Sequence, residues 1–485
     1  MKKLIASLAV LSLLCACSQG AKRSIDIGPD ANISGLRVAT TAGSSYDVVL
    51  SDRTDITLFR YSTRSDELKA LVDGRADVIW DDEVAFNKNI RSLNGVKIAT
   101  LGANTFPTAF MFNKENYELA QACTDVLRRM ESDGTLQQLK DYWLTGRYLD
   151  EGYTQVPLED NTGTPIRVAT GAMSAPITFM ADEQWYGIEI DILRTVANEL
   201  HRPLEIDLYD VAGGILAIKS GVVDILCGGV FITQERERDF LFSIPYHNYH
   251  SAYFVNDLEK GKEKIGFLAS VKRCLITENR WKYITNGLWE TIKISILSIL
   301  LGSILGAGLY FMKRSRRGWV RAIGKVYRSL MAGIPQLVLL LILFYAVFAK
   351  SGVPPDMVAV IAFAMFFATA ASNIYETSLG AVPHGQTEAG LALGFTHSQT
   401  FLNIVFPQAL RHGLPLFKGQ CISLLKGTSI VGYIAIHDLT RAGDLIRSRT
   451  FDAVLPLLIV TVIYFLLVWL FGVLLDLATP KKKVL

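Results

Sequence analysis

Apolar residues are distributed in two different ways along the chain. Up to about residue 255 they form short runs that alternate with stretches in which apolar positions recur at helical spacing, as at 37–40 and at 66–72. Beyond residue 286 the apolar runs are each about 20 residues or longer, which is enough to cross a bilayer. The pattern predicts an α/β region followed by an all-α transmembrane region.

The α/β region, 22–255, contains strands and helices in alternation from residue 31 onward. A long amphipathic stretch at 117–143 predicts a helix interrupted at Gly134. The acidic segment 150–164 contains Gly and Pro and is expected to be a linker.

A repeated pattern divides this region in two. The tetrapeptide Arg-Val-Ala-Thr occurs at 37–40 and again at 167–170. A helix followed by Gly-x-x-Asp and an apolar residue occurs at 66–78 and again at 214–225. We therefore expect two similar α/β lobes with a ligand site between them.

The transmembrane region, 287–480, follows an amphipathic connector at 256–286. Basic residues at 313–317 and 481–483 mark the cytoplasmic side. An odd number of spans then places the α/β region outside the cytoplasm. The five expected spans are 287–312, 325–349, 357–380, 413–436 and 453–476.

The first 17 residues resemble a lipoprotein signal peptide, with two lysines, an apolar run and the sequence Leu-Cys-Ala-Cys at 14–17. The resemblance implies lipid attachment at Cys17; an ordinary signal peptide or an uncleaved anchor is the alternative. Of the other cysteines, Cys227 is expected in the core, and a disulfide between Cys123 and Cys227 is left open.

The formal net charge of +3 gives no reason to expect a nucleic-acid partner. The pattern Gly-x-x-x-x-Gly-Lys-Ser/Thr, which binds ATP phosphates, does not occur in the sequence. No metal-ligand spacing, cofactor motif or convincing set of nucleophile and base is present either. We therefore expect a chain that is not an enzyme and needs no metal or cofactor.

The stretch 388–407 lies between two expected spans, within the loop 381–411. It resembles the EAA loop of permease subunits of ATP-binding-cassette importers, which docks on a separate cytoplasmic ATPase. Gly390 replaces the second alanine of that pattern, and an ordinary amphipathic loop is the alternative. The matching residues, for which the resemblance implies ATPase coupling, are Glu388, Ala389, Gly394, Ile404 and Pro407.

Two stretches of the first half, 229–236 and 242–246, resemble the first-lobe signature of periplasmic binding proteins for polar amino acids. The resemblance implies that Arg236 pairs with the ligand's α-carboxylate, a geometry suited to a planar guanidinium. Gly229 and Thr233 belong to the same signature. Phe231 occupies a position that the family usually gives to a small hydroxyl residue.

Residues of the other lobe complete the expected amino-acid site. The turn Gly43-Ser44-Ser45 resembles the family's Gly-Thr-Thr turn, which implies that Ser44 and Ser45 also hold the carboxylate. Asp82 matches the residue that receives the α-ammonium, with Asp81 as the alternative. Ser174 and Val211 stand where the family stacks aromatic rings on the ligand, so the side-chain pocket is expected to differ.

The order of these pieces suggests a circular permutation. Residues 31–95 resemble the family's second lobe, whereas 96–146 and 165–255 resemble its first lobe. In that arrangement a single connection near 91–101 is expected to join the lobes and loosen the hinge. The alternative is two unrelated half-domains that bind nothing.

Together these resemblances imply amino-acid import across the bacterial cytoplasmic (inner) membrane by a fused substrate-binding and permease subunit. The expected partners are an amino-acid ligand, a separate ATP-binding-cassette ATPase and a second permease copy, as a homodimer. A ligand-gated ion channel is one alternative, because 429–434 resembles a potassium filter with Ile434 in place of its last glycine. A sensor that only binds is the other.

Overall fold

The structure is a computed structural model of the 485-residue chain. It describes residues 25, 27–28, 31–86, 88–170, 175–258 and 266–478. The chain forms two compact units. The first comprises Met1–Trp281 with Asp444–Pro456, and the second comprises Lys282–Gly443 with Leu457–Leu485.

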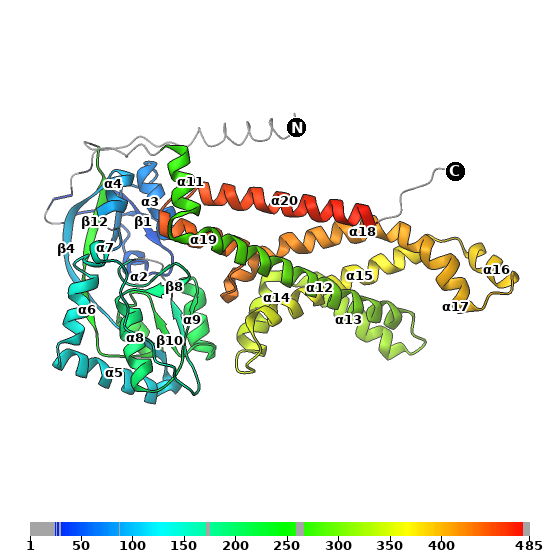
Figure 1. The fold of residues 1–485 in the computed structure, drawn as a ribbon, viewed down its shortest axis with the longest axis horizontal. Helices are drawn as coiled ribbons and strands as arrows, with labels where there is room; N and C mark the ends of the chain where they lie inside the picture. Colours follow the sequence, from blue (N-terminus) through cyan, green and yellow to red (C-terminus); the bar gives the residue numbers. More distant parts are fainter. Residues whose placement is uncertain are drawn as a thin grey trace. The chain divides into compact units, whose positions relative to one another are not determined.

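The first unit contains two lobes, each built on a five-stranded sheet (Figure 1). In lobe A the strand order is β2-β1-β3-β12-β4. β1 pairs in parallel with β2 and β3, whereas β12 is antiparallel to β3 and β4. The strands are β1 (Arg37–Thr41), β2 (Thr57–Tyr61), β3 (Val78–Asp82), β4 (Val96–Thr108) and β12 (His247–Asn256). The helices are α2 (Ser45–Ser51), α3 (Arg64–Val72) and α4 (Lys88–Asn94).

Lobe B repeats this topology, with the order β11-β5-β10-β6-β9. β6 pairs in parallel with β9 and β10, and β5 is antiparallel to its neighbours. The strands are β5 (Met111–Asn113), β6 (Ile166–Thr170), β9 (Leu204–Leu208), β10 (Ile225–Cys227) and β11 (Phe240–Phe242). The helices are α5 (Tyr117–Ser132), α6 (Thr135–Trp143), α7 (Tyr148–Glu151), α8 (Ile188–Glu199), α9 (Val211–Ser220) and α10 (Gln234–Asp239). A hairpin joins β7 (Phe179–Ala181) to β8 (Gln184–Tyr186).

The repeated sequence pattern corresponds to one structural element in each lobe. Arg37, at the start of β1, donates through its side chain to both carboxylate oxygens of Asp77, at 3.0 and 2.7 Å. Arg167, at the start of β6, does the same to Asp224, at 3.1 and 2.8 Å. Each aspartate also accepts from its arginine's own backbone N–H. The ion pair thus ties the start of β1 to the turn before β3 in lobe A, and the start of β6 to the turn before β10 in lobe B.

The connection between the lobes differs from the expected one. β4 and β12 are long antiparallel strands of the same sheet, with His247 opposite Thr108. The chain therefore crosses into lobe B after residue 108 and returns before residue 247. The expected lobe boundary between residues 95 and 96 is not where the chain changes lobe. The expectation of a single connection is wrong. Alternating apolar residues identify a strand but not the strand it pairs with.

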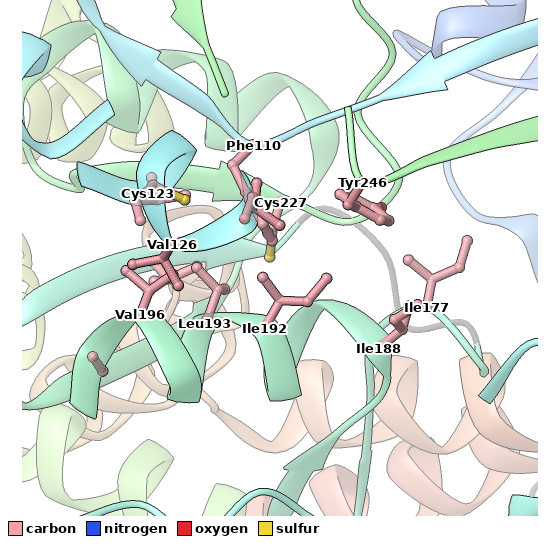
Figure 2. Packing of buried hydrophobic residues seen from close by; sticks show 14 of the residues in the cluster. Phe110, Cys123, Val126, Ile177, Ile188, Ile192, Leu193, Val196, Cys227 and Tyr246 are labelled. Atoms are coloured by element: carbon pink, nitrogen blue, oxygen red, sulfur yellow. The ribbon is translucent and has the colours of Figure 1, made fainter. Parts of the chain in front are cut away.

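The core of lobe B lies between its sheet and the helices α5 and α8 (Figure 2). Ile188, Ile192 and Leu193 of α8 are fully buried there, and each such side chain stabilises the fold by about 1.5–3 kcal/mol. Cys227 lies in this core, as expected. Cys123 and Cys227 are both free thiols in the same cluster, so the disulfide left open by the sequence is not formed.

The second unit contains the long apolar helices (Figure 1). Among the described residues three helices are long and apolar enough to cross a membrane, or up to five if two bent pairs each count as one span. The helices are α12 (Trp281–Arg314), α13 (Gly318–Gly333), α14 (Gln336–Ile342), α15 (Pro355–Gly380), α16 (His384–Ala392), α17 (His397–Thr400), α18 (Phe406–Gly427), α19 (Leu439–Thr450) and α20 (Leu455–Ala478).

The expected span at 325–349 is not one straight helix. α13 ends at Gly333, and the following segment 336–347 runs at 109° to it. Ile334 precedes Pro335, and the proline ring disfavours helical geometry at the preceding residue. Apolar content alone therefore overestimated the length of this helix.

Glycines allow α12 to approach α15 closely. A Cβ built on Gly302 would lie 2.9 Å from the Ala364 carbonyl oxygen, and one built on Gly306 would lie 2.8 Å from that of Ala368. Both glycines lie on one face of α12, four residues apart. Small residues at this spacing are how membrane helices bring their backbones together.

Candidate functional site

Arg236 reaches from lobe B to lobe A. Thr233 caps α10 and accepts a hydrogen bond from the Arg236 backbone N–H at 3.3 Å. The Arg236 Nη1 donates to Ser45 Oγ at 2.8 Å and to the Phe231 carbonyl oxygen at 3.3 Å. Burial lowers the pKa of Arg236 below its ordinary value, but a guanidinium remains charged at neutral pH. The structure thus brings together two residues that the sequence placed in one carboxylate site.

The turn before α2 presents Ser44 and Ser45. Gly43 has φ +73°, a conformation that favours glycine. The Ser44 hydroxyl accepts a hydrogen bond from the Asp47 N–H at 3.1 Å, so it serves as the helix cap in this state. A Cβ built on Gly43 would lie 3.6 Å from Val211 Cγ1 of lobe B. Val211, expected at a ligand-stacking position, therefore faces the serine turn.

Glu189, which the sequence analysis missed, holds the turn at Gly229. Its carboxylate accepts from the backbone N–H groups of Gly228 and Gly229 at 2.7 and 3.0 Å. It also accepts from the hydroxyls of Thr178 at 2.6 Å and Tyr246 at 2.7 Å. The available signal was an acidic residue between two isoleucines, Ile188 and Ile190, in the first turn of the helix that follows Gly187.

Phe231 follows β10 but packs into the core of lobe A. It is 1% exposed and stacks on Phe106 with ring centroids 4.8 Å apart. Its edge contact with Tyr46 has a centroid distance of 5.3 Å. In this conformation the ring is enclosed, and its carbonyl oxygen is what contacts Arg236.

Asp82 lies at the end of β3 and is 2% exposed. Its Oδ1 accepts from the Tyr46 hydroxyl at 2.8 Å, and its Oδ2 accepts from Arg64 Nη2 at 3.1 Å. Both oxygens of Asp81 accept from Arg64 at 2.8 Å. Asp81 is therefore fully paired with Arg64, whereas Asp82 makes one charged and one neutral hydrogen bond.

The acidic groups around Arg64 outnumber it. Glu67, Asp81 and Asp82 are all buried, and Arg64 forms an ion pair with both aspartates. Burial, reinforced by the charge of Asp81, raises the pKa of Asp82 to about 7. Burial and then the charge of Asp81 also raise the pKa of Glu67 well above its ordinary value. A cation brought to Asp82 would stabilise its ionised form.

Two predicted residues, Cys17 and Ser174, lie outside the described residues.

The predicted coupling residues lie on an exposed helical hairpin. Glu388 and Ala389 are exposed on α16, and Gly394, with φ +85°, ends that helix. Ile404 lies in the π-helical turn η4 (Phe401–Val405), and Pro407 is at the start of α18. Thr396 and Gln399 form a capping box at the start of α17. The side chains of Leu393 and Leu402 are 76% and 60% exposed, which leaves an apolar tip on this hairpin.

Close packing explains why Gly390 stands in place of alanine. A Cβ built on Gly390 would lie 2.6 Å from Thr400 Cγ2 and 2.9 Å from Ile404 Cδ1. Thr400 is 1% exposed and, being β-branched, has little rotamer freedom. Gly390 therefore fixes how α16 lies against η4.

Two family models match the chain. Residues 166–388 match the bacterial extracellular solute-binding proteins of family 3. Residues 298–484 match the inner membrane component of binding-protein-dependent transport systems.

Individual relatives match the second half. An L-cystine transport system permease protein of Bacillus subtilis is 35% identical over 186 residues, which cover 38% of this chain and 80% of the relative. A glutamate/aspartate import permease protein of Escherichia coli is 32% identical over 195 residues, which cover 38% of this chain and 87% of the relative. An amino acid ABC transporter of known crystal structure is 30% identical, covers 45% of this chain and 99% of its own and has a TM-score of 0.40.

Proposed function

We propose, from the premise that the chain belongs to the family of inner membrane components of binding-protein-dependent transport systems, that it imports amino acids. In this proposal the α/β lobes capture the amino acid on the extracytoplasmic side of the inner membrane, and the helical unit conducts it. Binding protein and permease are then fused in one chain.

The contact between Arg236 and Ser45 carries the binding part of the proposal. A guanidinium of one lobe and a hydroxyl of the other meet at 2.8 Å, at the serine turn of lobe A. An α-carboxylate entering here would replace the direct contact by hydrogen bonds to both groups. Asp82 would receive the α-ammonium. Charge-assisted bonds at both ends of the ligand favour closure of the lobes on it.

The exposed hairpin 384–405 supports a separate ATPase partner. Glu388 and the apolar residues Leu393 and Leu402 are accessible to another protein. We propose that this hairpin docks on an ATP-binding-cassette subunit. A second copy of this chain would provide the other half of the permease, as a homodimer.

The element order supports a circularly permuted binding region. The antiparallel strand of lobe A, β12, comes last in the chain, although it lies between β3 and β4 in the sheet. The solute-binding family model begins to match only at residue 166, where β6 starts. We propose that the permutation cuts the family's chain within lobe A and keeps both strands that connect the lobes.

Uptake by the full chain tests the proposal. The chain would be reconstituted in proteoliposomes with the ATPase subunit, and uptake of labelled cystine, arginine, glutamate and glutamine measured with and without ATP. We expect ATP-dependent uptake of at least one of these amino acids. Binding without uptake, or uptake that does not need ATP, would contradict the transport mechanism.

Two glycine variants test the hairpin. Gly390→Ala should disturb the packing of α16 on Thr400, at a cost of about 1–3 kcal/mol, and should lower uptake without changing ligand affinity. Gly385→Ala is the matched control, because nothing lies within 4 Å of a Cβ built there. Equal uptake by the two variants would remove the hairpin from the coupling step.

A further inference from the structure

A segment from the membrane half of the sequence folds with the binding lobes. Asp444–Pro456 belongs to the first unit. It comprises the second half of α19, a short loop and the start of α20, and we call it the bridging segment. In sequence it joins the last two apolar helical stretches of the chain. Its contacts with the lobes therefore link the α/β region to the segment between two apolar helices of the same polypeptide.

Arg447 and Phe451 hold the bridging segment to lobe A. Ser65 Oγ, in the first turn of α3, donates to the Arg447 carbonyl oxygen at 2.8 Å. The Arg447 guanidinium pairs with Asp66 and also with Asp444. Phe451 packs against Phe86 with ring centroids 5.7 Å apart. These contacts involve an ion pair, a hydrogen bond and an apolar contact, all with lobe A.

Arg449 holds the same segment to lobe B. Its guanidinium lies over the ring of Phe179, with Cζ 4.6 Å from the ring centroid, and donates to the Tyr153 hydroxyl at 3.4 Å. Phe179 and Tyr153 contact each other at a centroid distance of 5.3 Å. A cation over an aromatic face is stabilised most when it is shielded from water, as Arg449 is.

Glu278 of the connector forms an ion pair with Arg449. It accepts from Arg449 Nη2 at 2.7 Å and from Nε at 3.2 Å. Glu278 also forms an ion pair with Arg280 at 2.9 Å, so two arginines neutralise its carboxylate. The next residue of the connector, Asn279, donates to Asp182 of the β7–β8 hairpin at 3.0 Å. Connector and bridging segment therefore meet the same face of lobe B.

Two arginines on one helical turn thus contact two different lobes. The lobes are joined by the β4 and β12 crossings, a construction that permits hinge motion between them. In this structure Arg236 of lobe B meets Ser45 of lobe A, so the lobes are close together. If they separated, a rigid helical turn could not keep both contacts. Each arginine would keep its partner outside the lobes, Asp444 or Glu278, but the segment would lose its contacts with one of the two lobes.

We propose that the bridging segment is a sensor of lobe closure. It binds the surface formed by Ser65, Asp66 and Phe86 on lobe A together with Tyr153 and Phe179 on lobe B, and it binds both parts only when the lobes have closed. Closure on an amino acid therefore fixes the position of the start of α20 and the end of α19. This inference rests on the proposed transport function, because it assigns the closure signal to the permease.

Hydrogen exchange in the full chain tests the proposal. The chain would be placed in lipid nanodiscs with the ATPase subunit and compared with and without a mixture of the proteinogenic amino acids and cystine. We expect exchange of peptides covering 444–456 to slow by about tenfold when the mixture is added. Equal exchange with and without the mixture would overturn the proposal, whatever the transport activity.

Variants separate the sensor from a merely structural contact. Asp66→Asn should abolish the ligand-dependent protection of 444–456 and reduce the stimulation of ATP hydrolysis severalfold at saturating amino acid. Because coupling is reciprocal, amino-acid affinity should also fall, but only about severalfold. Exchanging the charges, with Asp66→Arg and Arg447→Asp together, should restore the protection and the stimulation. Asp55→Asn is the matched control, since Asp55 forms an ion pair with Arg53 on lobe A away from the bridging segment.

The outcomes distinguish the two proposals. Ligand-dependent protection without uptake would leave the sensor standing and reject transport. Uptake with wild-type stimulation in the Asp66→Asn variant would reject the sensor and leave transport standing. A loss of stimulation that disappears at saturating amino acid would also reject it, because it would reflect ligand occupancy alone.

Discussion

Lobes A and B have the same sheet topology but differ in how their buried acidic groups are neutralised. Both have the same sheet order and the same ion pair, Arg37 with Asp77 in one and Arg167 with Asp224 in the other. Lobe B contains one buried carboxylate beside its binding turn, Glu189, and four donors satisfy it. Its cation, Arg236, points away from this network to lobe A.

Lobe A instead contains three buried acids around Arg64. Glu67 Oε1 has no hydrogen-bond partner among the described residues, and the pKa of Asp82 is raised to about 7 by burial and the charge of Asp81. The difference fits the proposed binding of a zwitterion, because lobe B supplies a cation and lobe A holds an excess of buried acidic groups. In lobe A three buried acids surround one arginine, so the ammonium group of a bound ligand would add a second positive charge there.

The largest effect is expected at the cation. Arg236→Ala should lower amino-acid affinity by at least about 100-fold, because two charge-assisted hydrogen bonds to the carboxylate are lost. Binding of the labelled amino acids would be measured on the full chain in detergent. Arg236→Lys should bind with intermediate affinity, since an ammonium keeps the charge but not the bidentate geometry.

The control for this variant is Arg167→Ala in the same lobe. It removes the same charge from Arg167, which pairs with Asp224 within the sheet region of lobe B and not with the proposed ligand. Amino-acid affinity should therefore stay within a few-fold of wild type. Comparable losses in both variants would mean that Arg236 acts through the lobe's overall charge or folding, and the carboxylate assignment would fail.

The next effect concerns Asp82 and pH. Its folded pKa of about 7 lies above the ordinary value, and the groups facing it are Asp81, Arg64 and Tyr46. If Asp82 must ionise to receive the ammonium, binding releases a proton. Affinity should therefore fall below about pH 7, by up to about tenfold per pH unit.

Asp82→Asn provides the check, because it cannot ionise. Its affinity should be lower than that of the wild type above about pH 7 and should no longer fall between pH about 7 and about 5, so that the two proteins converge at low pH. Calorimetry in two buffers of different ionisation heat would measure the proton released. An unchanged slope in the variant would transfer the ammonium role to another acid.

Much of the frame could be predicted from the sequence, since strands, helix periodicity and the repeated pattern are local signals. The break at Gly134, with φ +83°, is an example. The pairing of β12 with β4 could not be predicted, because residues 247–256 and 96–108 carry no local mark of being partners. The bend at Pro335 was missed because the apolar content of a segment does not show whether its helix changes direction.

The site was predicted in part. Motif resemblance singled out Arg236 and Ser45, and the structure brings them to 2.8 Å, while their role in binding an amino acid stays a prediction. It did not identify Arg64 or Glu189, whose roles arise from contacts between distant segments. The bridging segment was also beyond reach, because Ser65 and Arg447 lie far apart in sequence and meet only in the folded unit.

The two buried glutamates should respond in opposite ways to neutralisation. Glu189→Gln replaces an acceptor of four hydrogen bonds by an amide with two donors of its own, and should cost about 2–3 kcal/mol. Glu67→Gln keeps the bond from Thr41 and removes a charge that burial opposes. Its stability at neutral pH should equal or exceed wild type, measured as the midpoint of thermal unfolding.

The sign of the pH effect follows from the raised pKa of Glu67. The folded state binds the proton more tightly than the unfolded state, so Glu67 favours folding below its unfolded pKa. That contribution declines as pH rises toward the folded pKa. The wild type should therefore lose more stability than Glu67→Gln between pH about 5 and about 8. Parallel pH profiles would show that Glu67 does not carry this linkage.

The smallest effect compares the frame pairs directly. Asp77→Ala and Asp224→Ala each remove the acceptor of the hydrogen bonds from an arginine's backbone N–H and guanidinium, and each should cost about 1–2 kcal/mol. The two costs should agree within about 0.5 kcal/mol if the lobes are equivalent frames. Limited proteolysis, with cleavage sites assigned to each lobe, would measure them separately. A clear difference would mean that the hinge strands β4 and β12, which both belong to the sheet of lobe A, do not stabilise the two lobes equally. The shared topology would then not imply shared energetics.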